Sequence, residues 1–354
     1  YDEELLLKFQ RRLLATGQFT SALVSASPTQ AQAHEVPVSV ALLEGKARRV
    51  ELGAGYSTDR GPRVQATYHD NNMLDRAWRL TAGLSIDRLV KEGNVGLAFP
   101  RQENGIHYAL QAKGRDEYIS GQDVLNWSVS GARIYAVEEY ESASSLEYLN
   151  ERSKLKGGTR DTRAALFANQ SWLWNNLDDP INPRRGTTFQ IETGGALEPL
   201  LSSRSFARVH LRGNLLYPMG RQFTLALRGE AGTVIANSRK DIPSAYVFRT
   251  GGDTSIRGYG YESLGVAEND AIVGGRYLLV GSVELIRWLN REWGVAAFID
   301  GGNAWDRLEK LDPVYGYGLG VRWRSPIGNI SFDLAYGDAT HELRVHLNAG
   351  VVFR

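Results

Sequence analysis

The chain has 354 residues, with 41 Lys and Arg against 40 Asp and Glu, so its formal net charge of +1 gives no electrostatic reason to expect a nucleic-acid partner. It contains no cysteine, which excludes disulfides, cysteine-bound zinc and thiol nucleophiles. No run approaches the ~18 uninterrupted apolar residues of a transmembrane helix, and the most apolar window, 277–286, contains Glu284. A helical membrane protein is therefore excluded. The 38 glycines and 10% aromatic residues suit a soluble α/β enzyme or a transmembrane β-barrel.

Residues 1–47 differ from the rest of the chain. Apolar residues at helical spacing and an acidic first turn predict a helix over 2–14, and strand-like runs follow at 19–25 and 36–43. A helix and two strands are too little to close a core. This segment is therefore predicted to be the tail of a truncated α+β module.

From residue 48 onward, apolar and other residues alternate with a period of two. The segments are about ten residues long, enough to cross a bilayer when tilted, and their even number fits a bacterial outer-membrane barrel. A sandwich would have strands of about 5–6 residues, and a propeller would show a repeat of about 40 residues. Residues 48–354 are thus predicted to form a 16-stranded antiparallel transmembrane β-barrel. The segments are 50–57, 62–69, 76–88, 92–100, 104–116, 122–137, 140–155, 160–175, 186–198, 203–218, 221–237, 273–289, 291–303, 314–325, 327–338 and 341–353.

Motifs for enzymatic chemistry are missing from the sequence. The 6 histidines are scattered, and neither a Gly-x-Ser-x-Gly nor a phosphate-binding loop occurs. Gly316, Gly318 and Gly320 alternate, which indicates one crowded or lumen-facing strip of a strand rather than a nucleotide loop. We therefore expect no enzyme activity, no metal site and no cofactor.

The connection over 238–272 is long and rich in glycine, and loops of that length are usually functional. It carries a string that resembles the Val/Ile-Arg-Gly-Phe/Tyr motif of the BamA-type superfamily of outer-membrane insertases and translocators. The motif residues are Gly251, Gly252, Asp253, Ile256, Arg257, Gly258 and Tyr259. Further matches resemble the same superfamily in its own order, and several are similar to its TamA branch: 52–59, 179–180 with 183–186, 261–265, 273–276, 298–303 and 324–328.

This resemblance implies that residues 1–47 are the last part of a polypeptide-transport-associated (POTRA) domain in the periplasm. It implies insertion or secretion of proteins at the bacterial outer membrane without a covalent reaction. The implied partners are a TamB-like periplasmic protein, client outer-membrane proteins such as autotransporters, and outer-membrane lipid. Two alternatives are a two-partner secretion transporter, which exports a protein through its lumen, and a passive porin, although porins lack both a POTRA module and an Arg-Gly-Tyr loop.

Alternation also predicts which side chains face the lumen. Lipid-facing Val295, Ala297 and Ile299 leave Phe298 and Asp300 pointing inward, and the same argument turns Glu284 inward. The resemblance implies that the loop folds back into the barrel. Arg257 is then expected to pair with Asp300, close to Glu284 and Phe298.

A weak lateral seam is predicted where the first strand, 50–57, meets the last, 341–353. The first strand is short and contains Gly53 and Gly55, and the last contains Asn348 and Gly350, all poor strand formers. The alternative is that these glycines only relieve crowding in the lumen. Val351 and Phe353 are expected to form the C-terminal assembly signal, weakened because Arg354 follows instead of a terminal aromatic residue.

Overall fold

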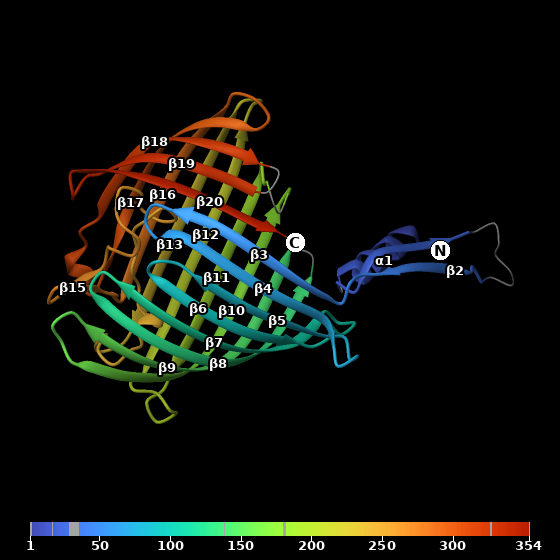
Figure 1. The fold of residues 1–354 in the computed structure, drawn as a ribbon, viewed down its shortest axis with the longest axis horizontal. Helices are drawn as coiled ribbons and strands as arrows, with labels where there is room; N and C mark the ends of the chain where they lie inside the picture. The colour runs from blue at the N-terminus through green and yellow to red at the C-terminus, as the bar shows by residue number, and fades with distance from the viewer. Residues whose placement is uncertain are drawn as a thin grey trace.

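The computed structural model describes residues 2–15, 17–27, 35–137, 139–179, 182–325 and 328–353. A small N-terminal module of helix α1 (Glu3–Ala15) and the antiparallel strands β1 (Phe19–Ala26) and β2 (Val38–Glu44) lies outside the barrel, near one of its ends (Figure 1). The Asp2 carboxylate caps α1 by accepting the backbone N–H of Glu4 at 2.9 Å. Neither this helix nor any other in the described ranges is long and apolar enough to span a membrane. The predicted helix and both strands are present, with ends shifted by one or two residues.

Sixteen antiparallel strands close into a barrel, as predicted (Figure 1). Neighbours in sequence are neighbours in the sheet, and the last strand returns to the first. The strands are β3 (Arg48–Ser57), β4 (Gly61–Met73), β5 (Trp78–Ile86), β6 (Val90–Ala98), β7 (Ile106–Ile119), β8 (Gln122–Val137), β9 (Tyr140–Leu155), β10 (Arg160–Leu177), β11 (Gly186–Ala196), β12 (Phe206–Met219), β13 (Phe223–Ile235), β16 (Tyr277–Trp288), β17 (Trp293–Trp305), β18 (Val314–Ser325), β19 (Gly328–Gly337) and β20 (Glu342–Phe353).

The two-residue period of the sequence sets the two faces of the barrel wall. On β16, Leu279, Val283 and Leu285 are exposed on the outer face, whereas Ser282 and Glu284 are buried on the inner face. This arrangement matches an apolar band that faces lipid and a polar lumen.

The connection between β13 and β16 folds into the barrel and forms a hydrophobic core with its wall. Loop residues Tyr246, Phe248, Ile256 and Tyr259 pack with wall residues that include Phe167. The rings of Phe167 and Tyr246 lie 4.5 Å apart. One end of the lumen is therefore filled by protein.

Two details of the connection differ from the prediction. Strand β16 begins at Tyr277 and not at residue 273, because Val273 pairs with Val266 in a hairpin of the loop, β14 (Val266–Glu268) with β15 (Ala271–Val273). A short 3₁₀ helix, η2 (Ser244–Tyr246), also interrupts the loop. Of the predicted motif positions, Pro180, Pro326 and Ile327 lie outside the described residues.

Candidate functional site: the loop anchor and the barrel seam

Arg257 reaches from the loop into the barrel wall and is held there by Asp300 on β17. Its backbone N–H and its Nε donate to Asp300 Oδ2 at 3.0 and 2.7 Å, and its Nη2 donates to Oδ1 at 2.9 Å. The Asp300 side chain is 0% exposed. The fork of the guanidinium therefore meets the carboxylate with two parallel charge-assisted hydrogen bonds, a geometry that lysine cannot reproduce.

The same guanidinium contacts two further carboxylates and one ring. Its Nη1 donates to Glu284 Oε2 at 2.6 Å and to Asp333 Oδ2 at 3.3 Å, and its Cζ lies 3.4 Å from the centre of the Phe298 ring. Burial lowers the pKa of Arg257, but the hydrogen bond and charge of Asp300, joined by Glu284, raise it above its usual value. The side chain thus stays a cation inside the barrel.

Arg322 on β18 is a second cation of this anchor, and Arg228, whose Nη2 lies 4.0 Å from Asp300 Oδ1, is a third, so that three arginines face three carboxylates. Arg322 donates to Glu284 at 2.7 and 2.8 Å and to Asp333 at 2.6 Å. The expected neighbours of Arg257 are all present, but Arg322 and Asp333 were missed by the sequence argument. Both residues lie at positions of β18 and β19 whose side chains face the lumen, and the two-residue alternation of these strands could have identified them.

Three alternating glycines of β18 make room for the anchor, in line with the predicted lumen-facing strip. A Cβ on Gly316 would overlap the carbonyl oxygen of Arg257, and one on Gly320 would overlap Asp333 Oδ1. A Cβ on Gly318 would stand 2.8 Å from Phe298 Cζ. The loop backbone can approach the wall this closely at Arg257 only because Gly316 has no side chain, and Gly318 and Gly320 leave room for the wall side chains Phe298 and Asp333 of the anchor.

A second set of contacts, here named the latch, joins the loop to both strands of the seam. It consists of Asp59 after β3, His346 on β20, and Asp253 and Gly258 in the loop. Gly258 N–H donates to His346 Nε2 at 2.9 Å, and His346 Nδ1 lies 3.2 Å from Asp59 Oδ2. Because Nε2 accepts, the neutral ring carries its proton on Nδ1 and donates it to Asp59.

Asp253 places a second carboxyl group in the latch. Its backbone N–H donates to Asp59 Oδ2 at 3.0 Å, and its side chain accepts a hydrogen bond from Ser57 Oγ at 3.4 Å. Burial, followed by the nearby negative charge of Asp59, raises the pKa of Asp253 above its ordinary value. The docked loop therefore favours the protonated form of this side chain.

The seam between β20 and β3 has the shortest register in the described part of the barrel. It contains six residue pairs, from Asn348 with Ser57 to Phe353 with Leu52, whereas every other neighbouring pair contains seven to sixteen. The first strand is short, as expected: β3 has 10 residues, and only β5 and β6, with 9 each, are shorter in the described barrel. The overlap is short because the two strands are offset along each other.

The predicted seam residues all lie in this overlap. Gly55 pairs with Gly350, Gly53 with Val352, and Val351 with Ala54; for Val351 and Phe353 the structure describes the backbone alone. A Cβ on Gly53 would come 2.5 Å from the flexible lumen side chain of Gln65, so crowding also accounts for that glycine.

The closed sixteen-stranded wall, with a long loop anchored by an arginine inside it, defines a class of outer-membrane-type barrels. The chain belongs to the Omp85 superfamily, since the model of the Omp85 superfamily domain matches residues 43–353.

Among curated relatives, the outer membrane protein assembly factor BamA of Nitratidesulfovibrio vulgaris is 23% identical over 94% of this chain and 44% of the relative. The protein of the same name from Neisseria meningitidis is 22% identical over 95% of this chain and 50% of the relative. The chain thus spans about half the length of these relatives.

Solved structures show the same fold. The crystal structure of BamA from Haemophilus ducreyi lacking POTRA domains 1–3 is 18% identical, with a TM-score of 0.81 over 97% of this chain and 77% of that chain. CdiB from Escherichia coli is 13% identical, with a TM-score of 0.63 over 97% of this chain and 69% of that chain.

Proposed function

We propose that this chain is the membrane barrel of a TamA-type assembly factor that inserts client proteins, autotransporters among them, into the bacterial outer membrane. Residues 1–47 would be part of the last POTRA domain in the periplasm, where a TamB-like protein would engage the complete protein. Membership of the Omp85 superfamily and the assembly-factor relatives support this proposal. The two bacterial relatives described above carry the name BamA, so the TamA branch rests on the loop and strand motifs of the sequence.

The short seam is the observation on which the mechanism rests. A strand that enters lipid must not leave its N–H and C=O groups unpaired, because each such group costs several kcal/mol. A barrel edge that parts easily can pair with the incoming strand until that strand has a partner in its own barrel. With six pairs between β20 and β3, this edge has the fewest register pairs to separate in the described part of the barrel.

A disulfide across the seam tests the mechanism directly, because the chain has no native cysteine. Gly55→Cys with Gly350→Cys places two thiols at paired positions of β3 and β20. A matched control, Gly229→Cys with Gly281→Cys, crosslinks the paired glycines of β13 and β16, which have no atom within 4 Å of an added Cβ. We expect oxidation to stop client assembly by the seam variant only, and reductant to restore it.

The two alternatives predict a different outcome of this experiment. A two-partner secretion transporter and a porin both move their cargo through the lumen, so an oxidised seam would leave them active. Full client assembly with a completely crosslinked seam would therefore contradict the gate and favour passage through the lumen.

A further inference from the structure

An unpaired arginine lies on the outer, lipid-facing surface of β8. Leu125, Trp127 and Val129 are exposed on this outer face. The alternate residues of β8 face the lumen, as shown by Gln122, which accepts a hydrogen bond from Arg249 of the loop inside the barrel. Arg133 continues the outer register, is exposed, and has no hydrogen-bond or ion-pair partner among the described residues. A cation in this position needs a partner from outside the chain.

The aromatic residues of the outer face place Arg133 near one edge of the apolar band. Trp127 and Tyr148, with ring centres 5.6 Å apart, mark one edge. Tyr135 and Tyr140, with ring centres 6.3 Å apart, lie near the end of β8 and at the start of β9 and mark the opposite edge. Strand β8 ends on the side of the barrel that faces the N-terminal module (Figure 1). Arg133 precedes Tyr135 by two residues, which puts its Cα about 5 Å inside that edge on a tilted strand. Its long side chain can return the guanidinium to the depth of the lipid phosphates.

Polar groups flank Arg133 on both neighbouring strands. Its register partners are Tyr108 on β7 and Ser144 on β9. Ser144 Oγ donates to Gln170 Oε1 at 2.5 Å, and Gln170 Nε2 donates to Ser142 Oγ at 2.9 Å. This polar row interrupts the apolar face at the depth where lipid phosphate and ester oxygens lie.

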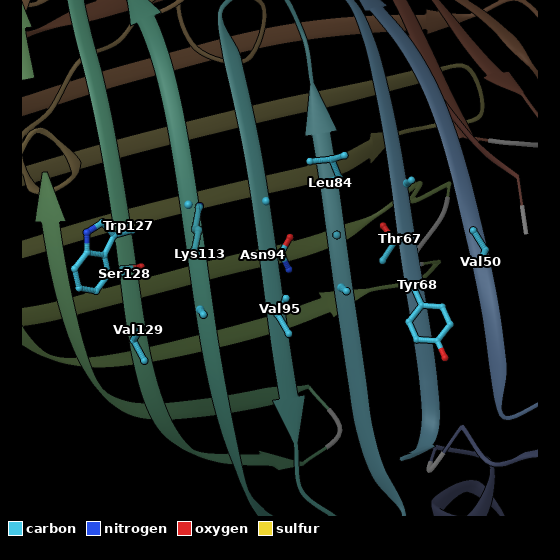
Figure 2. Close-up of a pocket in the computed structure, with 16 residues that line it drawn as sticks. Val50, Thr67, Tyr68, Leu84, Asn94, Val95, Lys113, Trp127, Ser128 and Val129 are labelled. Atoms are coloured by element: carbon cyan, nitrogen blue, oxygen red, sulfur yellow. The ribbon is translucent and has the colours of Figure 1, made fainter. Parts of the chain in front are cut away.

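A groove of about 600 Å³ crosses the same outer face from β3 to β8 (Figure 2). Small residues such as Ala82, Ala112 and Gly114 form its floor, and Leu84, Trp127 and Val129 are among its exposed walls. Val129 is four residues from Arg133, about 13 Å along the strand. The other end of the groove reaches Val50 on the seam strand β3.

We propose that Arg133 and this groove bind one glycerophospholipid, with its phosphate on Arg133 beside Tyr108 and an acyl chain running past Gly131 into the groove. Guanidinium and phosphate match in charge and in hydrogen-bond geometry. The far end of the groove lies at the seam strand β3, which the proposed function opens. Because the proposed function puts the N-terminal module in the periplasm, it also assigns this lipid to the periplasmic leaflet, and only that assignment rests on the proposed function.

Native mass spectrometry of the full chain in detergent with added phosphatidylglycerol tests the site. Arg133→Gln is expected to weaken binding about fivefold, the effect of one exposed charge pair. Gly114→Leu should weaken it as well by filling the groove floor, where an added Cβ meets nothing within 4 Å. Arg152→Gln is the matched control, because Arg152 is also exposed and outward-facing but lies past the Trp127–Tyr148 edge.

Equal phosphatidylglycerol affinity of Arg133→Gln and the unmodified chain would overturn the site. An equal loss in Arg152→Gln would overturn it too, since binding would then follow charge alone. If lipid A binds more tightly than phosphatidylglycerol and its binding still depends on Arg133, the ligand of the site is a lipopolysaccharide. That result would refute the proposed glycerophospholipid. None of these outcomes depends on client assembly, so failure of the seam experiment and failure of this one are separate results.

Discussion

Replacing Asp300 by alanine is expected to release the loop from the barrel wall while the barrel itself still assembles. Asp300 accepts three hydrogen bonds from Arg257, two of them from the guanidinium, and its side chain is 0% exposed. Removing one partner of such a buried pair costs about 3–5 kcal/mol. Even about 3 kcal/mol corresponds to a more than hundredfold rise in the undocked population of the loop.

Hydrogen–deuterium exchange of peptides from the loop measures this population in the purified, folded barrel. The matched control is Asp241→Asn, which weakens a 2.7 Å pair between Asp241 of the same loop and Arg204 of the β11–β12 connection, where the two side chains are 54% and 34% exposed. Asparagine also tolerates the positive φ of 68° at this position, so the backbone is not strained. That exposed pair contributes at most about 1 kcal/mol, so the control should change exchange less than about sixfold. Arg257→Ala should match Asp300→Ala and lower client assembly. Unchanged loop exchange in Asp300→Ala, or full activity of both variants, would refute the anchor.

Three further predictions concern the loop. A protease site inserted at Ser238 should be cleaved on intact cells, and cleavage only after the outer membrane is disrupted would reverse the proposed orientation. Gly316→Ala should raise loop exchange as Asp300→Ala does, because its Cβ would overlap Arg257, whereas Gly229→Ala should not, because its Cβ meets nothing within 4 Å. Burial and Asp59 raise the pKa of Asp253, so loop docking should weaken as pH rises from about 4, the ordinary carboxyl value, through the raised value. Asp253→Asn cannot ionise and should remove that component of the pH dependence; identical slopes of protection against pH would contradict this assignment.

The barrel and the lumen-facing direction of the anchor carboxylates were predictable from the sequence because both follow from local strand geometry. Side chains alternate on a strand, so one apolar face fixes the direction of every residue in register. That rule alone places Asp300 and Glu284 in the lumen. The identity of Arg257 as their partner came from the resemblance of its motif, since periodicity says nothing about where a loop of this length folds.

The remaining partners of the anchor depend on pairing across the sheet. Arg322 and Asp333 meet because β18 and β19 pair in a register that sets Gly320 opposite Asp333, and a one-residue slip would turn either side chain outward. His346 and Asp59 are 287 positions apart in the chain. Their contact exists only after the barrel has closed, so no short-range pattern encodes it.

Closure also explains why the seam differs along its length. Near the loop, buried His346 and Asp59 join β20 and β3 through the latch, and the loop itself adds a backbone donor at Gly258. Towards the N-terminal module, the two strands share only the six-pair ladder that ends at Phe353. Separating that ladder exposes backbone N–H and C=O groups that an incoming strand can pair with. Separating the latch would instead leave buried polar side chains without hydrogen-bond partners, and the backbone of an incoming strand does not replace those side-chain partners. A gate built on this seam would therefore open from the end beside the N-terminal module, and the docked loop would hold the other end closed.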